Sequence, residues 1–106
     1  MEIQTHQQLL HTLQEQFADR PAQVTFTQWE GEEEDETVTA FQAVLKQVSL
    51  SEGDFAGKDL FLLFEAEGEE VLELLMEIPA EEEDLGMLDG GQLRIFGTEA
   101  ELVIER

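Results

Sequence analysis

The hydrophobic period of this chain changes at Pro21, and that change restricts the fold more than any other feature of the sequence. Before Pro21, one apolar stripe recurs at helical spacing and consists of Leu9, Leu10, Leu13 and Phe17. After Pro21, the apolar residues mostly alternate with polar ones, which is the period of a half-buried strand. The 106 residues therefore predict a single domain, 1–106, with an amphipathic helix over about 5–18 and a strand-rich region over about 22–105.

The start of the predicted helix carries a capping signal and two histidines. Thr5 is a favourable N-cap residue, and Gln8 three residues later completes a capping-box pattern. His6 and His11 are five residues apart, so they point about 140° away from each other on a helix with 3.6 residues per turn. A metal-binding pair on one helix face needs a spacing of three or four residues. We therefore expect both histidines at the surface and not in one metal site.

The first strand-like segment is QVTFTQW, which contains the single tryptophan of the chain. Its alternation places Val24 and Phe26 on one face and Thr25, Thr27 and Trp29 on the other. If both faces of the sheet are covered, Trp29 is a core residue, and this is the interpretation that we favour. If Trp29 is instead exposed beside the acidic residues that follow it, its ring would suit a cationic partner.

A longer alternation follows over 38–50. One face would carry Val38, Ala40, Val44, Val48 and Leu50, and the other would carry Phe41, Ala43 and Leu45. A helix is the alternative, because Val38, Phe41, Leu45 and Val48 also fit helical spacing. The Thr and Val content of the segment favours a strand.

The remaining segments predict hairpins. LFLLFEAEGEEVLELLMEI, 60–78, reads as two arms with Glu67 and Gly68 at the turn, although the second arm could instead be a short helix closed by Pro79. AEEEDLGMLDGG, 80–91, is predicted to be a loop that ends in a turn at the two glycines. QLRIF and AELVIE are predicted strands, and their mismatched phases indicate a turn or bulge near Gly97.

These elements predict an α+β fold: the N-terminal amphipathic helix followed by a five- to six-stranded, mostly antiparallel sheet, either open or curled into a small barrel. In this order of elements alone, the chain resembles the Sm-like fold. Layout does not imply function. Sm-like proteins bind RNA, and the charge of this chain disfavours RNA.

The formal net charge is −21, from 26 acidic and five basic residues, and 23 of the acids lie from residue 30 onward. Direct binding to nucleic acid or to an anionic membrane is disfavoured, because those partners require Lys and Arg. A basic protein partner is favoured, and the chain itself is expected to be a monomer or a homodimer. With no Cys, no signal-peptide pattern and no long apolar run, we expect a cytoplasmic protein.

Two acidic runs, 30–36 and 81–84, are the candidate surface for such a partner. Neither has the ligand spacing of a calcium loop. The simplest interpretation of each is a solvated loop, the first at a hairpin tip; the alternatives are a partner surface and a weak divalent-metal site. The candidate surface consists of Trp29, Glu30, Glu32, Glu33, Glu34, Asp35, Glu36, Glu81, Glu82, Glu83 and Asp84.

Catalytic motifs are absent from the sequence, which has no G-x-S-x-G, no H-E-x-x-H and no P-loop. Glu73 and Glu77 lie in an apolar arm and would be of interest if buried, but the simpler expectation is that they face solvent. We therefore expect no catalytic, cofactor or metal residues. The favoured function is a non-enzymatic protein-interaction module, with a nucleic-acid mimic that inhibits a basic DNA-binding protein as the alternative. A weakly metal-dependent protein or small enzyme is the second alternative.

Overall fold

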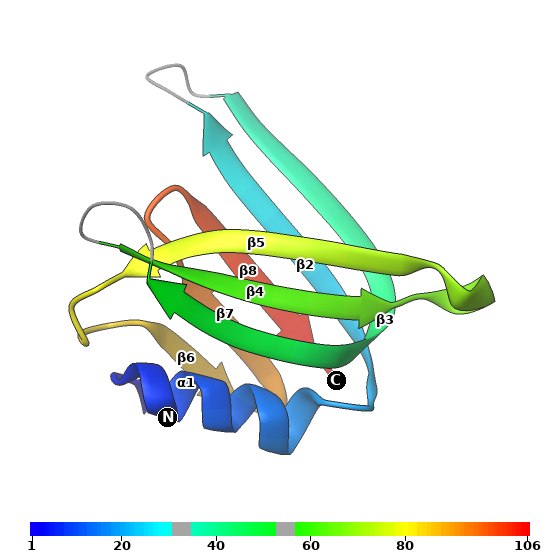
Figure 1. Ribbon diagram of the computed structural model, residues 1–106, viewed down its shortest axis with the longest axis horizontal. Helices are drawn as coiled ribbons and strands as arrows, with labels where there is room; N and C mark the ends of the chain where they lie inside the picture. The colour runs from blue at the N-terminus through cyan, green and yellow to red at the C-terminus, as the bar shows by residue number, and fades with distance from the viewer. Residues whose placement is uncertain (31–34, 53–56) are drawn as a thin grey trace.

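The helix predicted before Pro21 and the strands predicted after it are both present in the computed structural model, which describes residues 1–30, 35–52 and 57–106 (Figure 1). The elements are β1 (Glu2–Ile3), α1 (His6–Thr12), the π-helical turn η1 (Leu13–Phe17), β2 (Pro21–Glu30), β3 (Asp35–Glu52), β4 (Gly57–Glu65), the 3-10 turn η2 (Glu67–Glu69), β5 (Val71–Pro79), β6 (Gly86–Asp89), β7 (Gln92–Phe96) and β8 (Ala100–Glu105).

The helix begins at the predicted cap. The Thr5 hydroxyl accepts a hydrogen bond from the Gln8 backbone N–H at 3.0 Å. In a capping box, the side chain three residues after the N-cap accepts from the N–H of the N-cap residue itself. Here the Gln8 side chain accepts instead from the N–H of Gln4, one residue before the N-cap, at 3.1 Å. At the other end, the N–H of Ala18 donates to the carbonyl of Leu13 at 3.0 Å, which closes a wide π turn before the chain leaves for β2.

The strands form one antiparallel sheet of eight strands in the order β1-β6-β7-β8-β2-β3-β4-β5. The sheet curls but does not close into a barrel, because β1 and β5 end it without pairing to each other. The prediction of five to six strands was too low. The strand β1 spans two residues near the N-terminus, and β6 spans four residues inside the segment 80–91 that was predicted to be a loop. Segments this short show no recognisable hydrophobic period.

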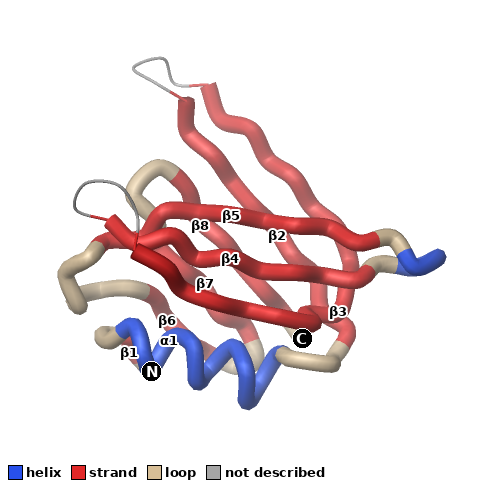
Figure 2. The backbone as a smooth tube through the Cα atoms, viewed as in Figure 1, coloured by secondary structure: helices blue, strands red, loops and turns tan. Residues whose placement is uncertain are grey.

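A bulge in β3 bends the sheet into two crossing layers. β3 pairs with β2 from Asp35 to Val44 and with β4 from Val44 to Glu52, and its register with β4 shifts between Leu45 and Gln47. Figures 1 and 2 show the β4–β5 arm crossing over β2, β8 and β7. β3 is thus a strand, as favoured, and its helical alternative is wrong.

The same bulge corrects the predicted faces of 38–50. One extra residue reverses which face each later side chain occupies. Val48 and Leu50 therefore pack against the core on the same side as Phe41, Ala43 and Leu45. Val38, predicted to share a face with Val48, is instead 56% exposed.

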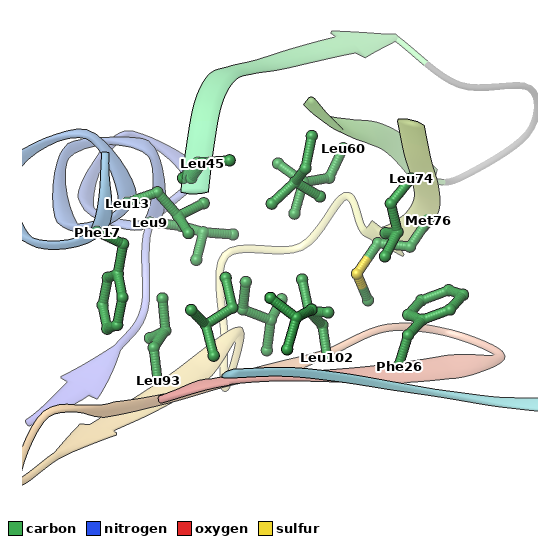
Figure 3. Packing of buried hydrophobic residues seen from close by; sticks show 14 of the residues in the cluster. Leu9, Leu13, Phe17, Phe26, Leu45, Leu60, Leu74, Met76, Leu93 and Leu102 are labelled. Carbon is green, nitrogen blue, oxygen red and sulfur yellow. The ribbon is translucent and has the colours of Figure 1, made fainter. Parts of the chain in front are cut away.

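The core lies between the two layers and is closed on one side by the helix (Figure 3). Leu9, Leu13 and Phe17, all fully buried, lie at the helical end of the core. Phe26 and Leu74 lie at the other end, on facing layers. The apolar stripe that identified the helix is therefore the surface that covers one side of the sandwich.

The predicted turns connect the strands as expected. β4 and β5 are joined across Glu67–Glu69, where Gly68 adopts a φ of 79°, and β5 is a strand and not the alternative helix. β6 and β7 are joined by Gly90 and Gly91, with φ of 57° and 87°, which is the geometry of a two-residue hairpin turn. The N–H of Gly97 donates to the Ala100 carbonyl at 2.8 Å, which places a turn where the two strand phases disagreed.

Candidate functional site

Glu30, Asp35 and Glu36 of the first acidic run lie at the outer end of the β2–β3 hairpin. β2 and β3 remain in register out to Glu30 and Asp35, so the run connects two paired strands, as the hairpin interpretation requires. Glu36 is exposed. The candidate residues Glu32, Glu33 and Glu34 lie outside the described residues.

Trp29 lies beside this run on the outer face of β2 and is 42% exposed, so the predicted core position is wrong. The pairing of β2 with β8 extends only to Gln28, and the hairpin continues past it. The backbone N–H of Trp29 donates to the Glu99 carbonyl at 3.0 Å, and Glu36 is its register partner on β3. The indole is therefore exposed and has an exposed glutamate as its cross-strand neighbour.

The second acidic run, 81–84, forms an exposed bend between β5 and β6. One of its carboxylates has an internal partner: Glu82 Oε1 accepts from the His6 backbone N–H at 3.2 Å. A carboxylate at a helix N-terminus offsets the partial positive charge of the unpaired amides. Glu82 therefore stabilises the start of α1, whereas Glu81, Glu83 and Asp84 are exposed to solvent.

His6 is buried, with 8% of its surface exposed, so the expectation of a surface position is wrong for this residue. Its Nε2 lies 2.9 Å from the Pro79 carbonyl oxygen, which can only accept, so this contact is a hydrogen bond when Nε2 carries the hydrogen. Its Nδ1 lies 3.2 Å from Glu82 Oε1. His11 is exposed as predicted, so the two histidines do not form one site.

The described residues of the two acidic runs are not brought together. In Figure 1, the described end of the β2–β3 hairpin and the β5–β6 loop lie at different corners of the molecule. The turn between β7 and β8 lies between them. It bonds to Trp29 through Glu99 and to β5 through Thr98, whose N–H donates to the Glu77 carbonyl at 3.0 Å and whose hydroxyl donates to Glu77 Oε1 at 2.9 Å.

A feature that the sequence did not indicate is a groove of about 350 Å³ between β5 and the inner face of the β2–β3 hairpin. Its lining consists of Phe26, Gln28, Thr39, Phe41, Leu72, Glu73, Leu74 and Leu75. Three separate segments supply these residues, so no local pattern could reveal the groove. The nearest signal was Leu75, an apolar residue between Glu73 and Glu77 on the outer face of β5.

The strand β5 carries exposed apolar residues on its outer face, one of which, Leu75, also lines the groove. Leu75 is 60% exposed and Val71 is 56% exposed, on the same face as Glu73 and Glu77. Both glutamates face solvent, as expected. The groove is therefore lined mainly by apolar side chains, with Gln28, Thr39 and the exposed Glu73 as its polar residues.

The basic residues leave most of the acidic charge without a counterion in the chain. Arg94 pairs with Glu101 at 3.1 Å and Lys46 with Asp19 at 3.5 Å. Even one-to-one pairing of all five Lys and Arg would leave 21 of the 26 acids unmatched, which is the net charge of −21. The surface is therefore strongly anionic overall.

The described part of the chain contains no group of three or more His, Asp or Glu side chains arranged to hold a metal ion. No helix within the described ranges is long and apolar enough to cross a membrane. Comparisons with protein families, with curated proteins and with solved structures found no match to this chain.

Proposed function

We propose that this protein is a non-enzymatic, cytoplasmic interaction module whose acidic surface engages a basic protein. The observation that supports the proposal is the excess of carboxylates over basic residues, 26 against five, on a folded domain. A field of one sign attracts a partner of the opposite sign and raises the rate of association. It also opposes binding to nucleic acid and to anionic lipid.

Exposed aromatic and apolar side chains supply the second requirement of an interface. Charge steers a partner, but apolar contacts at the centre of an interface contribute most of the affinity. Trp29 is exposed beside Glu36, and Leu75 is exposed between Glu73 and Glu77. A basic partner with apolar residues between its charges would match both places.

The test is capture from a cell lysate on the immobilised protein, first at low salt and then at high salt. Poly-glutamate on the same resin is the control, because it retains basic proteins by ion exchange alone. We expect a basic protein that the folded domain retains, that poly-glutamate does not, and that high salt releases. If the domain retains nothing at low salt beyond what poly-glutamate retains, the proposal fails.

The nucleic-acid mimic is a narrower form of the same proposal. A mimic would occupy the DNA-binding surface of its partner, so duplex DNA would displace the captured protein. Calorimetric titration with calcium, magnesium and manganese tests the metal-dependent alternative. Heat of binding from any of the three would favour that alternative over a module that acts through proteins alone.

A further inference from the structure

We infer that the edge of β5 that the described strands leave open binds an extended segment in which apolar residues alternate with Lys or Arg, adding one strand to the sheet. The inference rests on the proposed function and names the place and the partner chemistry. The edge is defined as Val71, Glu73 and Leu75, and the groove is the one already described between β5 and the β2–β3 hairpin.

The backbone geometry of β5 identifies which groups are available. β5 pairs with β4 along its whole length, and no described strand pairs with its other side. The Glu77 carbonyl points to that other side, because it accepts from the Thr98 N–H. Backbone groups of alternate residues in a strand point the same way, so Val71, Glu73 and Leu75 present their N–H and C=O groups to the open edge.

The groove gives an added strand a surface to pack against. The β2–β3 hairpin extends past β5 in Figure 1, so a strand beside β5 would lie over the inner face of the hairpin. Phe26 and Phe41 face this space, and Phe41 is held by an edge-on contact with Phe64 at 5.5 Å between ring centroids. Apolar side chains on one face of the added strand would fill the groove.

The other face of the added strand would meet carboxylates. Side chains of neighbouring strands lie directly beside each other on the same face, and opposite charges there are favourable. Glu73 and Glu77 are exposed on the outer face of β5, with Leu75 between them and Val71 before Glu73. Lys or Arg at alternate positions of the partner would lie beside these glutamates.

The same charges oppose the other occupant of an open edge, a second copy of this chain. Unpaired edges are templates for association, and proteins commonly protect them with charged residues. Two copies would each bring a net charge of −21 to the contact. The glutamates of β5 therefore discourage self-pairing while they favour a basic strand.

The peptide acetyl-Lys-Val-Lys-Val-Lys-Val-Lys-amide is the probe, titrated into ¹⁵N-labelled protein at low salt. A block peptide of the same composition, with four Lys followed by three Val, is the control for charge alone. We expect amide shift changes at Val71, Glu73 and Leu75 with the alternating peptide, and about tenfold weaker binding of the block peptide. Shift changes centred on 81–84, or equal affinities, would overturn the inference.

A pair of charge-reversal variants locates the effect. Glu73→Lys alters the edge, and Glu15→Lys makes the same charge change on the exposed face of the helix. We expect Glu73→Lys to raise the Kd for the alternating peptide about tenfold and Glu15→Lys to change it less than about threefold. Equal changes would show a diffuse electrostatic effect and overturn the site.

Two further outcomes separate this inference from the proposed function. If a captured basic protein binds wild type and Glu73→Lys equally, the edge is not the site, although the proposed function stands. If sedimentation shows a dimer that Leu75→Lys dissociates, a second copy occupies the edge and the inference fails. Circular dichroism of each variant confirms that the fold is intact before binding is compared.

Discussion

The two margins of the β3–β4–β5 layer differ in how they are covered. At the helix margin, along β3, the segment from α1 to β2 covers the core: the Asp19 N–H donates to the Leu45 carbonyl at 2.8 Å, and Leu13 is fully buried. At the β5 margin, along Val71–Pro79, the described contact is the β7–β8 turn at Glu77, beside the open groove.

The helix margin therefore contributes to the stability of the fold, and the β5 margin is the one available for binding. Buried apolar contacts at the helix margin contribute to the free energy of folding, since each large aliphatic side chain removed from water contributes about 1.5–3 kcal/mol. Exposed apolar residues at the β5 margin contribute little to folding and remain available to a partner. Substitutions at the two margins should therefore have effects of different kinds.

The largest expected effect comes from truncating a buried leucine at the helix margin. Leu13→Ala should lower the free energy of unfolding by about 2–5 kcal/mol, because it leaves a cavity between helix and sheet. Leu75→Ala is the matched control at the β5 margin, and it should change stability by less than about 0.5 kcal/mol. Urea denaturation measures both, and equal losses would remove the distinction between the margins.

The next effect tests the contacts at the start of the helix. His6→Ala removes the donor to the Pro79 carbonyl and should cost about 1–3 kcal/mol, because it leaves a part-buried acceptor unpaired. His11→Ala, on the exposed face of the same helix, should change stability by less than about 0.5 kcal/mol. Thermal unfolding of the two variants compares them. A His6→Ala variant as stable as His11→Ala would show that water replaces the lost bond.

Added salt should raise the stability of the whole domain. With a net charge of −21, self-repulsion opposes the compact state, and screening over about 10 Å at 0.1 M relieves it. A gain of about 1 kcal/mol would raise Tm by roughly 4–8 °C in a domain of this size. Thermal melts over a NaCl series measure the shift, and a Tm that falls with salt would contradict the expectation.

The smallest expected change in stability comes from the hydrogen bond between Thr98 of the β7–β8 turn and Glu77 of β5. Thr98→Val removes the hydroxyl that donates to Glu77 Oε1 and should cost about 0.5 kcal/mol, because the bond is exposed to water. Thr37→Val, at an exposed position of β3, is the control. A loss above about 2 kcal/mol for Thr98→Val would mean that the β7–β8 turn supports the fold as strongly as the helix margin does.

The period of the sequence was sufficient to predict the helix and the long strands. Leu9, Leu13 and Phe17 lie in the core as their spacing indicated, and Val24 and Phe26 share the buried face of β2. These patterns are local, because each strand or helix carries its own apolar face. They could be read without knowing what any segment packs against.

Features that depend on distant segments could not be predicted in this way. His6 is buried because Pro79 and Glu82, more than 70 residues away, lie against it. Trp29 is exposed because it lies on the outer face of β2, opposite the buried Val24 and Phe26, and beyond the end of the pairing with β8. The bulge near Lys46 reverses the alternation of inward and outward side chains partway along the strand. The faces of 38–50 could therefore not be assigned correctly from the spacing of apolar residues.

The bulge in β3 also affects the order in which backbone amides exchange with solvent deuterium. Val44 is in register with Pro21 of β2 on one side and with Glu65 of β4 on the other, so both layers meet at this residue. Opening the chain there disrupts the pairing of β3 in both layers, whereas no described strand pairs with the open side of Val71. Amides around Val44 should therefore exchange more slowly than the amide of Val71.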